Sequence, residues 1–338
     1  MAAYSFPQPT EMERLARLKG PAMTGRSLIW RFFSEKDVNS DVLRWFQKDL
    51  YTGFQNWRGI GGKPSPVTLN GEKEYLAAPG AYGDFFNLDE RELMSRTDPA
   101  NPDGPAIPIN DLVMEGQDEL IARESRLKEY ILWKLLVDGS FSVADKYSLP
   151  VYTGSYTQLA FTASVAWATV ATATPFKDLL GLPVLARGKE VNYGRNAVLM
   201  MNQTTANYIL NNTNAADLGG RLANGGNKIN TLADLNNVLS MAGVPDIVVV
   251  EEGYFTPGTS TWNPYIPNSK FVLVGHRVDT DTVGEYRNTR NIESSRGFGS
   301  YSKVIVQDKQ VPHSVEVHQG HNGGPVLFYP GSILKGNV

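Results

Sequence analysis

The chain has 338 residues, of which 41% are hydrophobic, 20% charged and 10% aromatic. This length and composition indicate a folded protein with one large core or two smaller ones, and they exclude a low-complexity disordered chain. Because 32 Lys and Arg stand against 35 Asp and Glu, a formal charge of −3, the chain lacks the overall positive field with which proteins grip nucleic acid. It has no cysteine, which excludes disulfides, thiolate metal sites and cysteine nucleophiles and suits folding in a reducing cytoplasm.

Neither a signal peptide nor a membrane span is expected. Residues 1–20 interleave acids and bases and contain no long apolar run. Residues 147–176 carry no charge, but they are rich in Thr and Ser and include Pro150 and Gly154 near their start. A spanning helix needs about 20 predominantly apolar residues, so we predict a buried strand followed by a buried or interface segment. We therefore expect a soluble protein that is intracellular at synthesis and has no membrane partner.

The segment 11–48 combines basic and aromatic residues. It has eight Lys and Arg against five Asp and Glu, and it also carries Trp30, Phe32 and Phe33. A solvated tail would not hold so many large apolar side chains. They must bury either in the chain's own core or against a neighbouring chain.

Residues 42–79 predict a long hairpin. An arm rich in aromatic and branched residues leads to the glycine-dense reversal 58–64, and a second arm returns through residues 66–77. Two strands bury too little surface to be stable alone in water, so the hairpin should rest on another surface.

The most clearly predicted element is a helix over residues 111–138, which would be about 42 Å long. Asn110 offers an N-cap, Asp111 suits the first turn, and Gly139 ends the helix. An apolar line at steps of three, four or seven predicts a helix that backs a core, and Glu124 and Lys128 predict an i,i+4 pair on its polar face.

Shorter elements alternate along the rest of the chain. We predict helices starting at Pro175 and covering 204–211 and 232–241, and strands over 151–162, 196–201, 247–250, 271–278, 303–307 and 311–318.

No catalytic constellation is evident. His318 and His321 are too close in sequence for a helical metal pair, and a surface or turn role is favoured for both. Acidic pairs such as Asp279 and Asp281 are expected by chance among 35 acids. We therefore predict no enzyme, no cofactor and no metal, while an enzyme that uses dispersed acids with His276, His313 or His318, in particular a metal-dependent hydrolase, remains the alternative from another class.

The layout is more informative than any motif. An aromatic N-terminal arm, an overlong hairpin and a long helix have no obvious use in a monomer. Such unfinished surfaces indicate heterologous contacts between identical copies, which close into rings and shells.

In this order of parts the chain resembles the major capsid proteins of tailed bacteriophages, with the Hong Kong 97 phage-type fold, and within them the lambda-type major head protein family. Four stretches carry the likeness: residues 74–79 with 88–93 at the hairpin exit, the helix 115–139, Trp167 with 175–179 and 197–210, and the ending 315–338 with Pro325 and Pro330.

The resemblance implies an α+β fold in five parts. These are an N-arm (1–40), an E-loop (41–80), a peripheral domain (81–170) with the spine helix 111–138, an axial domain (171–300), and a return to the peripheral domain (301–338). It also implies a capsid protein that assembles through hexamers and pentamers into an icosahedral shell around double-stranded DNA.

The implied partners are other copies of the chain, a scaffold, a portal, possibly a decoration protein, and packaged DNA bound non-specifically. The implied location is the virion capsid, assembled in the host bacterial cytoplasm. For intersubunit contacts the sequence nominates the hairpin tip, with Arg58, Gly59, Gly61, Gly62 and Lys63, and the N-arm residues Trp30, Phe32 and Phe33. A non-viral shell of the same fold, an encapsulin or a gene-transfer particle, is the alternative within this class.

Overall fold

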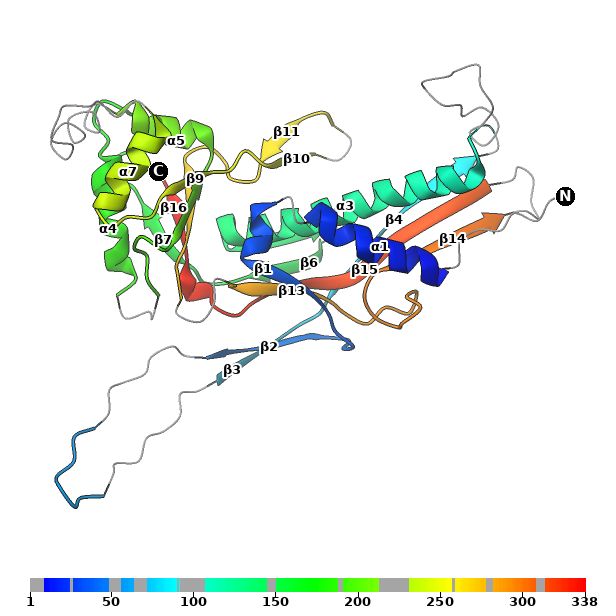
Figure 1. Cartoon of the computed structure of the whole chain (residues 1–338), viewed down its shortest axis with the longest axis horizontal. Helices are drawn as coiled ribbons and strands as arrows, with labels where there is room; N and C mark the ends of the chain where they lie inside the picture. The colour runs from blue at the N-terminus through cyan, green and yellow to red at the C-terminus, as the bar shows by residue number, and fades with distance from the viewer. Residues whose placement is uncertain are drawn as a thin grey trace.

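The fold is taken from a computed structural model that describes residues 9–24, 27–48, 56–63, 72–89, 91, 107–144, 150–187, 191–212, 231–256, 259–277, 282–307 and 314–338. Figure 1 shows an elongated body built on one long helix, a cluster of short helices at one end, and a hairpin that leaves the body.

The long helix α3 spans Ile109–Asp138, within two residues of the prediction. It begins after Pro108, so Asn110 lies inside the first turn and is not the N-cap. It ends as predicted at Gly139, whose φ of 72° is a left-handed conformation that glycine adopts without a steric cost.

The first sheet lies along α3. Its strands are β1 (Phe33–Asp37), β13 (Gly284–Asn288), β15 (Ser314–Leu327) and β14 (Tyr301–Gln307), in that order, and β4 (Gly80–Asp89) also pairs with β15. The strand predicted over 311–318 is thus the start of the 14-residue β15. Leu88, Val315 and Val317 on the sheet pack with Leu112 and Leu120 of α3 in one core cluster.

Glycine lets the strands of this sheet approach closely. A Cβ at Gly320 of β15 would lie 2.4 Å from the backbone oxygen of Tyr82 on β4, well inside van der Waals contact. The backbone of one strand cannot move away without breaking the ladder, so this position requires glycine.

The second sheet has the order β7 (Leu159–Thr162), β16 (Ile333–Asn337), β12 (Lys270–Val274), β8 (Val198–Met201) and β9 (Ile247–Val249). The helices that join it in one core are α4 (Pro175–Leu185), α5 (Gln203–Leu210) and α7 (Leu232–Met241). Trp167 stacks on Phe271 at 5.7 Å in this core. The C-terminal half of α3 packs against the other face of the same sheet.

Each sheet draws its strands from distant parts of the chain. β16, near the C-terminus, pairs with β12 and β7 in the second sheet. β13 lies in the first sheet, although β12 just before it lies in the second. An alternating strand pattern specifies which face is buried but not which strand is the neighbour, so these pairings were not visible in the sequence.

Residues 150–176 contain two strands where one was predicted. β6 (Pro150–Ser155) pairs with β5 (Ser140–Ala144), and β7 pairs with β16. Trp167 and Ala173 further on are fully buried. None of the described helices is both long enough and apolar enough to cross a membrane.

Candidate functional site

A hairpin that projects from the body is the first candidate surface. Strands β2 (Leu43–Lys48) and β3 (Glu72–Ala77) pair antiparallel, with Leu43 opposite Ala77 and Lys48 opposite Glu72. At the base, Leu43 is fully buried and the ring of Trp45 stacks on Tyr75 at 5.4 Å. The base of the hairpin is therefore anchored in the core, while the described residues of its tip, 56–63, lie far from the body (Figure 1).

The tip is a glycine turn. The Gly62 amide donates to the Gly59 carbonyl oxygen at 3.0 Å, and Gly61 has a φ of 81°. The Arg58 Nη1 donates to the Gly62 carbonyl oxygen at 3.1 Å and so closes the turn with its own side chain. The five nominated tip residues, which include Lys63, are described and exposed.

Two apolar side chains at the tip were not nominated from the sequence. Trp57 is 94% exposed and Ile60 is 111% exposed relative to the reference state. A glycine-rich turn of eight residues has no core in which to bury large apolar side chains. The sequence alone could therefore have identified both residues as exposed. With Arg58 and Lys63 and without an acid, the stretch 56–63 presents a cationic, apolar surface.

The nominated N-arm residues are placed differently from the expectation. Phe32 is 1% exposed and Phe33 is 2% exposed, and both lie in the chain's own core cluster with Tyr286. Trp30 is partly buried, and its indole N–H donates to Glu129 Oε1 at 3.2 Å. Of the two partners that the sequence left open for these aromatics, the chain's own core is therefore the one that the structure shows for Phe32 and Phe33.

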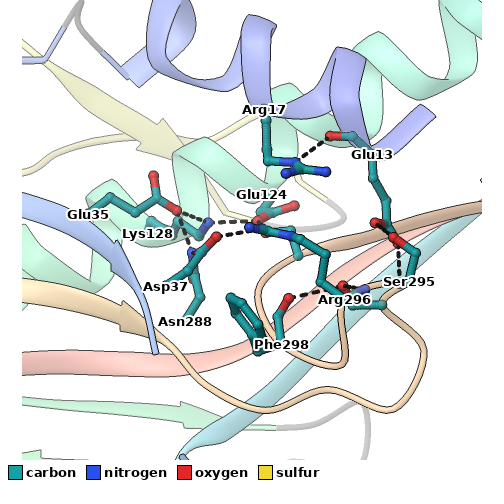
Figure 2. Close-up of polar contacts among 12 residues, drawn as sticks. Glu13, Arg17, Glu35, Asp37, Glu124, Lys128, Asn288, Ser295, Arg296 and Phe298 are labelled. Carbon is teal, nitrogen blue, oxygen red and sulfur yellow. Dashed lines mark hydrogen bonds and ion pairs between the residues drawn. The ribbon is translucent and has the colours of Figure 1, made fainter. Parts of the chain in front are cut away.

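A buried polar network joins this N-terminal segment to the body (Figure 2). Lys128 of α3 lies between two carboxylates, with its Nζ 2.6 Å from Glu35 Oε1 and 2.7 Å from Glu124 Oε1. The Asn288 amide donates to Glu35 at 2.8 Å and to Asp37 at 2.9 Å.

Farther out in the network, Arg296 binds Asp37 through its Nη2 at 2.7 Å, and Glu13 of α1 (Pro9–Thr24) accepts from both the amide and the hydroxyl of Ser295. Residues of this network line a pocket of about 290 Å³.

Burial makes the charges of this network interdependent. Burial alone would raise the pKa of Glu124, but the charge and hydrogen bond of Lys128 and the nearby His321 hold it at about 2. Burial would likewise depress the pKa of Lys128, yet Glu124 and Glu35 raise it above its ordinary value. Burial, reinforced by the Lys128 charge, lowers the pKa of His321 to about 3, so this histidine is neutral at pH 7.

The predicted i,i+4 contact between Glu124 and Lys128 is confirmed, but the helix face that was predicted to be polar is buried at Lys128. Lys128 is 4% exposed because α3 is covered on this side by the first sheet and by the N-terminal segment. Sequence spacing shows that two side chains meet but not what covers them.

The histidines have structural partners among the described residues. His321 shares a hydrogen bond of 2.9 Å with the Tyr286 hydroxyl, and His318 lies 2.9 Å from Glu316 Oε2 and stacks on Phe85. His276 pairs through its backbone with Asn192, whereas His313 lies outside the described residues. Within the part of the chain that the structure describes, no three His, Asp or Glu side chains gather as metal ligands would.

Comparison with known proteins identifies the fold. No family model matches the sequence, and no curated protein matches it. A protein assigned as a prophage capsid protein, from E. coli CFT073, is similar with a TM-score of 0.63 at 14% identity, covering 99% of this chain and 100% of that one.

Two further structures agree. A phage-related protein from Bordetella bronchiseptica RB50 gives a TM-score of 0.55 at 10% identity, over 95% of this chain and 96% of that one. The capsid of Myoviridae phage XM1 gives 0.50 at 11% identity, over 92% and 90%. The chain therefore has the fold of tailed-bacteriophage major capsid proteins, the Hong Kong 97 phage-type fold.

Proposed function

We propose that this chain is a major capsid protein, which self-assembles through hexamers and pentamers into an icosahedral shell that encloses packaged double-stranded DNA. The observation that carries the proposal is the hairpin tip. Trp57 and Ile60 are almost fully exposed at the end of an arm, and none of the other described residues covers them. A soluble protein rarely keeps such a group in water unless a partner buries it.

The partner that we propose for the tip is a second copy of the chain. A tip that is remote from its own body makes a heterologous contact, because the surface that receives it lies elsewhere on the neighbouring copy. Repeated around an axis, such contacts close into a ring, which is the geometry that capsomers require. The nominated residues Arg58, Gly59, Gly61, Gly62 and Lys63 belong to this proposed contact, whereas Phe32 and Phe33 are committed to the chain's own core.

Within this proposal, the parts of the chain correspond to the named parts of the capsid protein fold. The N-terminal segment up to residue 40 is the N-arm, residues 41–80 are the E-loop, α3 is the spine helix, and the second sheet with its helices is the core of the axial domain. A scaffold, a portal, a decoration protein and packaged DNA are further proposed partners, and the virion capsid, assembled in the bacterial cytoplasm, is the proposed location. The formal charge of −3 suits an inner wall that DNA touches without adhering.

Sedimentation of the purified chain over a range of concentrations, with and without residues 58–63, tests the proposal. We expect the intact chain to form large closed particles and the deletion variant to stay folded and small. An intact chain that remains a monomer at every concentration would refute self-assembly. A deletion variant that forms the same particles would refute the role of the tip.

A further inference from the structure

A second hairpin stands on the opposite edge of the body from β2 and β3. Its strands β10 (Gly253–Phe255) and β11 (Trp262–Pro264) pair antiparallel, with Phe255 opposite Trp262. Figure 1 shows this hairpin above α3, whereas the hairpin of β2 and β3 leaves the body below the first sheet. The tip of a chain's own β2–β3 hairpin therefore points away from β10 and β11.

One face of the second hairpin is fixed on the body. The ring of Tyr254 meets the ring of Tyr130 on α3 edge-on at 4.7 Å and stacks on Tyr265 at 5.8 Å. Since successive side chains of a strand point to opposite faces, Phe255 and its neighbour Trp262 lie on the other face. They are 65% and 44% exposed. The hairpin thus presents two large aromatic side chains to solvent from an anchored base.

The ring of Trp262 rests on a glycine. A Cβ at residue 253 would lie 2.7 Å from two atoms of this ring, so the ring lies against the bare backbone of Gly253. A larger residue there would push the ring away, which gives glycine a packing role in the strand. One side of the ring is therefore covered, and its remaining surface is available to a partner. We call Phe255 and Trp262 the aromatic patch.

The surroundings of the aromatic patch are acidic. Residues 247–269 include Glu251 and Glu252 and contain no Lys or Arg. Glu251 is exposed, and Glu252 accepts hydrogen bonds from two neutral groups of the N-terminal segment. Arg126 on α3 is the cation near them among the described residues, and it acts on Glu129 of the same helix. Acids therefore outnumber bases around the aromatic patch.

We propose that the aromatic patch is the surface that receives the hairpin tip of a second copy, an inference that rests on the proposed shell function. The tip carries Arg58 and Lys63 and no acid, next to the exposed Trp57 and Ile60. A cation is attracted to the face of an indole ring, and Arg makes this contact more often than Lys. The acids around the patch attract the same two cations, and the aromatic rings cover the apolar tip side chains.

The position of the patch suits a ring of copies. In such a ring each copy gives one surface to the next copy and receives the previous copy on a different surface. The hairpin tip and the aromatic patch lie on opposite edges of the elongated body, so every copy can do both at once (Figure 1).

Thiol cross-linking tests the contact, because the chain has no cysteine of its own. Gly59→Cys adds a thiol in the tip, where nothing lies within 4 Å of the new Cβ, and Thr261→Cys adds one at an exposed residue next to Trp262. The two variants would be mixed in equal amounts, assembled, and treated with a short bismaleimide, which joins two nearby thiols. We expect covalent dimers in the mixture and none in particles of either variant alone.

Gly59→Cys mixed with Ile292→Cys is the matched control, because Ile292 is 94% exposed but lies between β13 and β14 of the first sheet. This mixture should give no dimer. In addition, Trp262→Ser should raise the protein concentration needed for assembly by about tenfold, whereas Ile292→Ser should not.

The outcomes separate the contact from the shell function. Particles that form normally but give no dimer between Gly59→Cys and Thr261→Cys would overturn the aromatic patch as the receiving surface and leave the shell function standing. Equal linking in the control mixture, or an unchanged assembly concentration for Trp262→Ser, would overturn the patch as well. A native chain that forms no particles would refute the shell function, and the contact with it.

Discussion

The contribution of the hairpin tip to assembly can be estimated from the exposure of its two apolar side chains. Trp57 and Ile60 are 94% and 111% exposed, so each has nearly its whole surface available for burial on a neighbouring copy. Burying a large apolar side chain contributes about 1.5–3 kcal/mol. Replacing both by serine should therefore remove about 4 kcal/mol from each contact between copies. A loss of this size raises the concentration needed for assembly by roughly a thousandfold.

The assay is light scattering of the purified Trp57→Ser/Ile60→Ser variant against the native chain, over a wide range of protein concentrations. The unfolding free energy of the unassembled chain should not change, because both side chains are already exposed to solvent there. Ile292→Ser is a matched control, since Ile292 is 94% exposed on the body rather than on the hairpin. A double variant that assembles at the native concentration would refute the reasoning, as would one that loses stability as a monomer.

Three further predictions concern the fold itself. Lys128→Met leaves the buried Glu124 and the more exposed Glu35 without their cation and should cost about 3–5 kcal/mol in urea unfolding. Lys134→Met, at a partly exposed pair, should cost under about 1 kcal/mol, and equal costs would contradict the burial of Lys128. Because His321 has its pKa lowered to about 3, the unfolded chain takes up this proton first and stability should fall as the pH drops from about 6.5 towards 3. His321→Gln should flatten that part of the stability curve, and an unchanged slope would show that His321 is not the group responsible. Gly320→Ala should reduce the free energy of unfolding by about 1–3 kcal/mol, and so lower the melting temperature, because the added Cβ clashes with the backbone. Gly181→Ala, with open space around it in helix α4, should raise the melting temperature. A Gly320→Ala variant as stable as the native chain would contradict the close approach of β15 to β4.

Local features of the fold were predictable because their causes are local. Gly139 ends α3 where the apolar spacing ends, and the glycine-dense reversal at 58–64 identified the tip of the hairpin. Pro175 begins α4 because proline suits the first turn of a helix. In each case the residue that determines the structure lies within a few positions of the structure it determines.

Features that depend on distant segments were not predictable from the sequence. The C-terminal β16 pairs with β12 and β7, a choice that depends on how the two sheets meet. The burial of Lys128 requires Glu35, 93 residues away, and the covering N-terminal segment. The same holds for Glu252, whose link to Ser27 joins positions 225 residues apart. For the hairpin tip the limit was different, because the position was found and the exposure of Trp57 and Ile60 was overlooked.

Electron microscopy of the purified, concentrated chain tests the central claim most directly. The account predicts hollow, closed particles of uniform size in which each copy extends its hairpin over a neighbour. Fields that contain only separate copies, with the hairpin folded back on its own body so that Trp57 and Ile60 are covered, would contradict it.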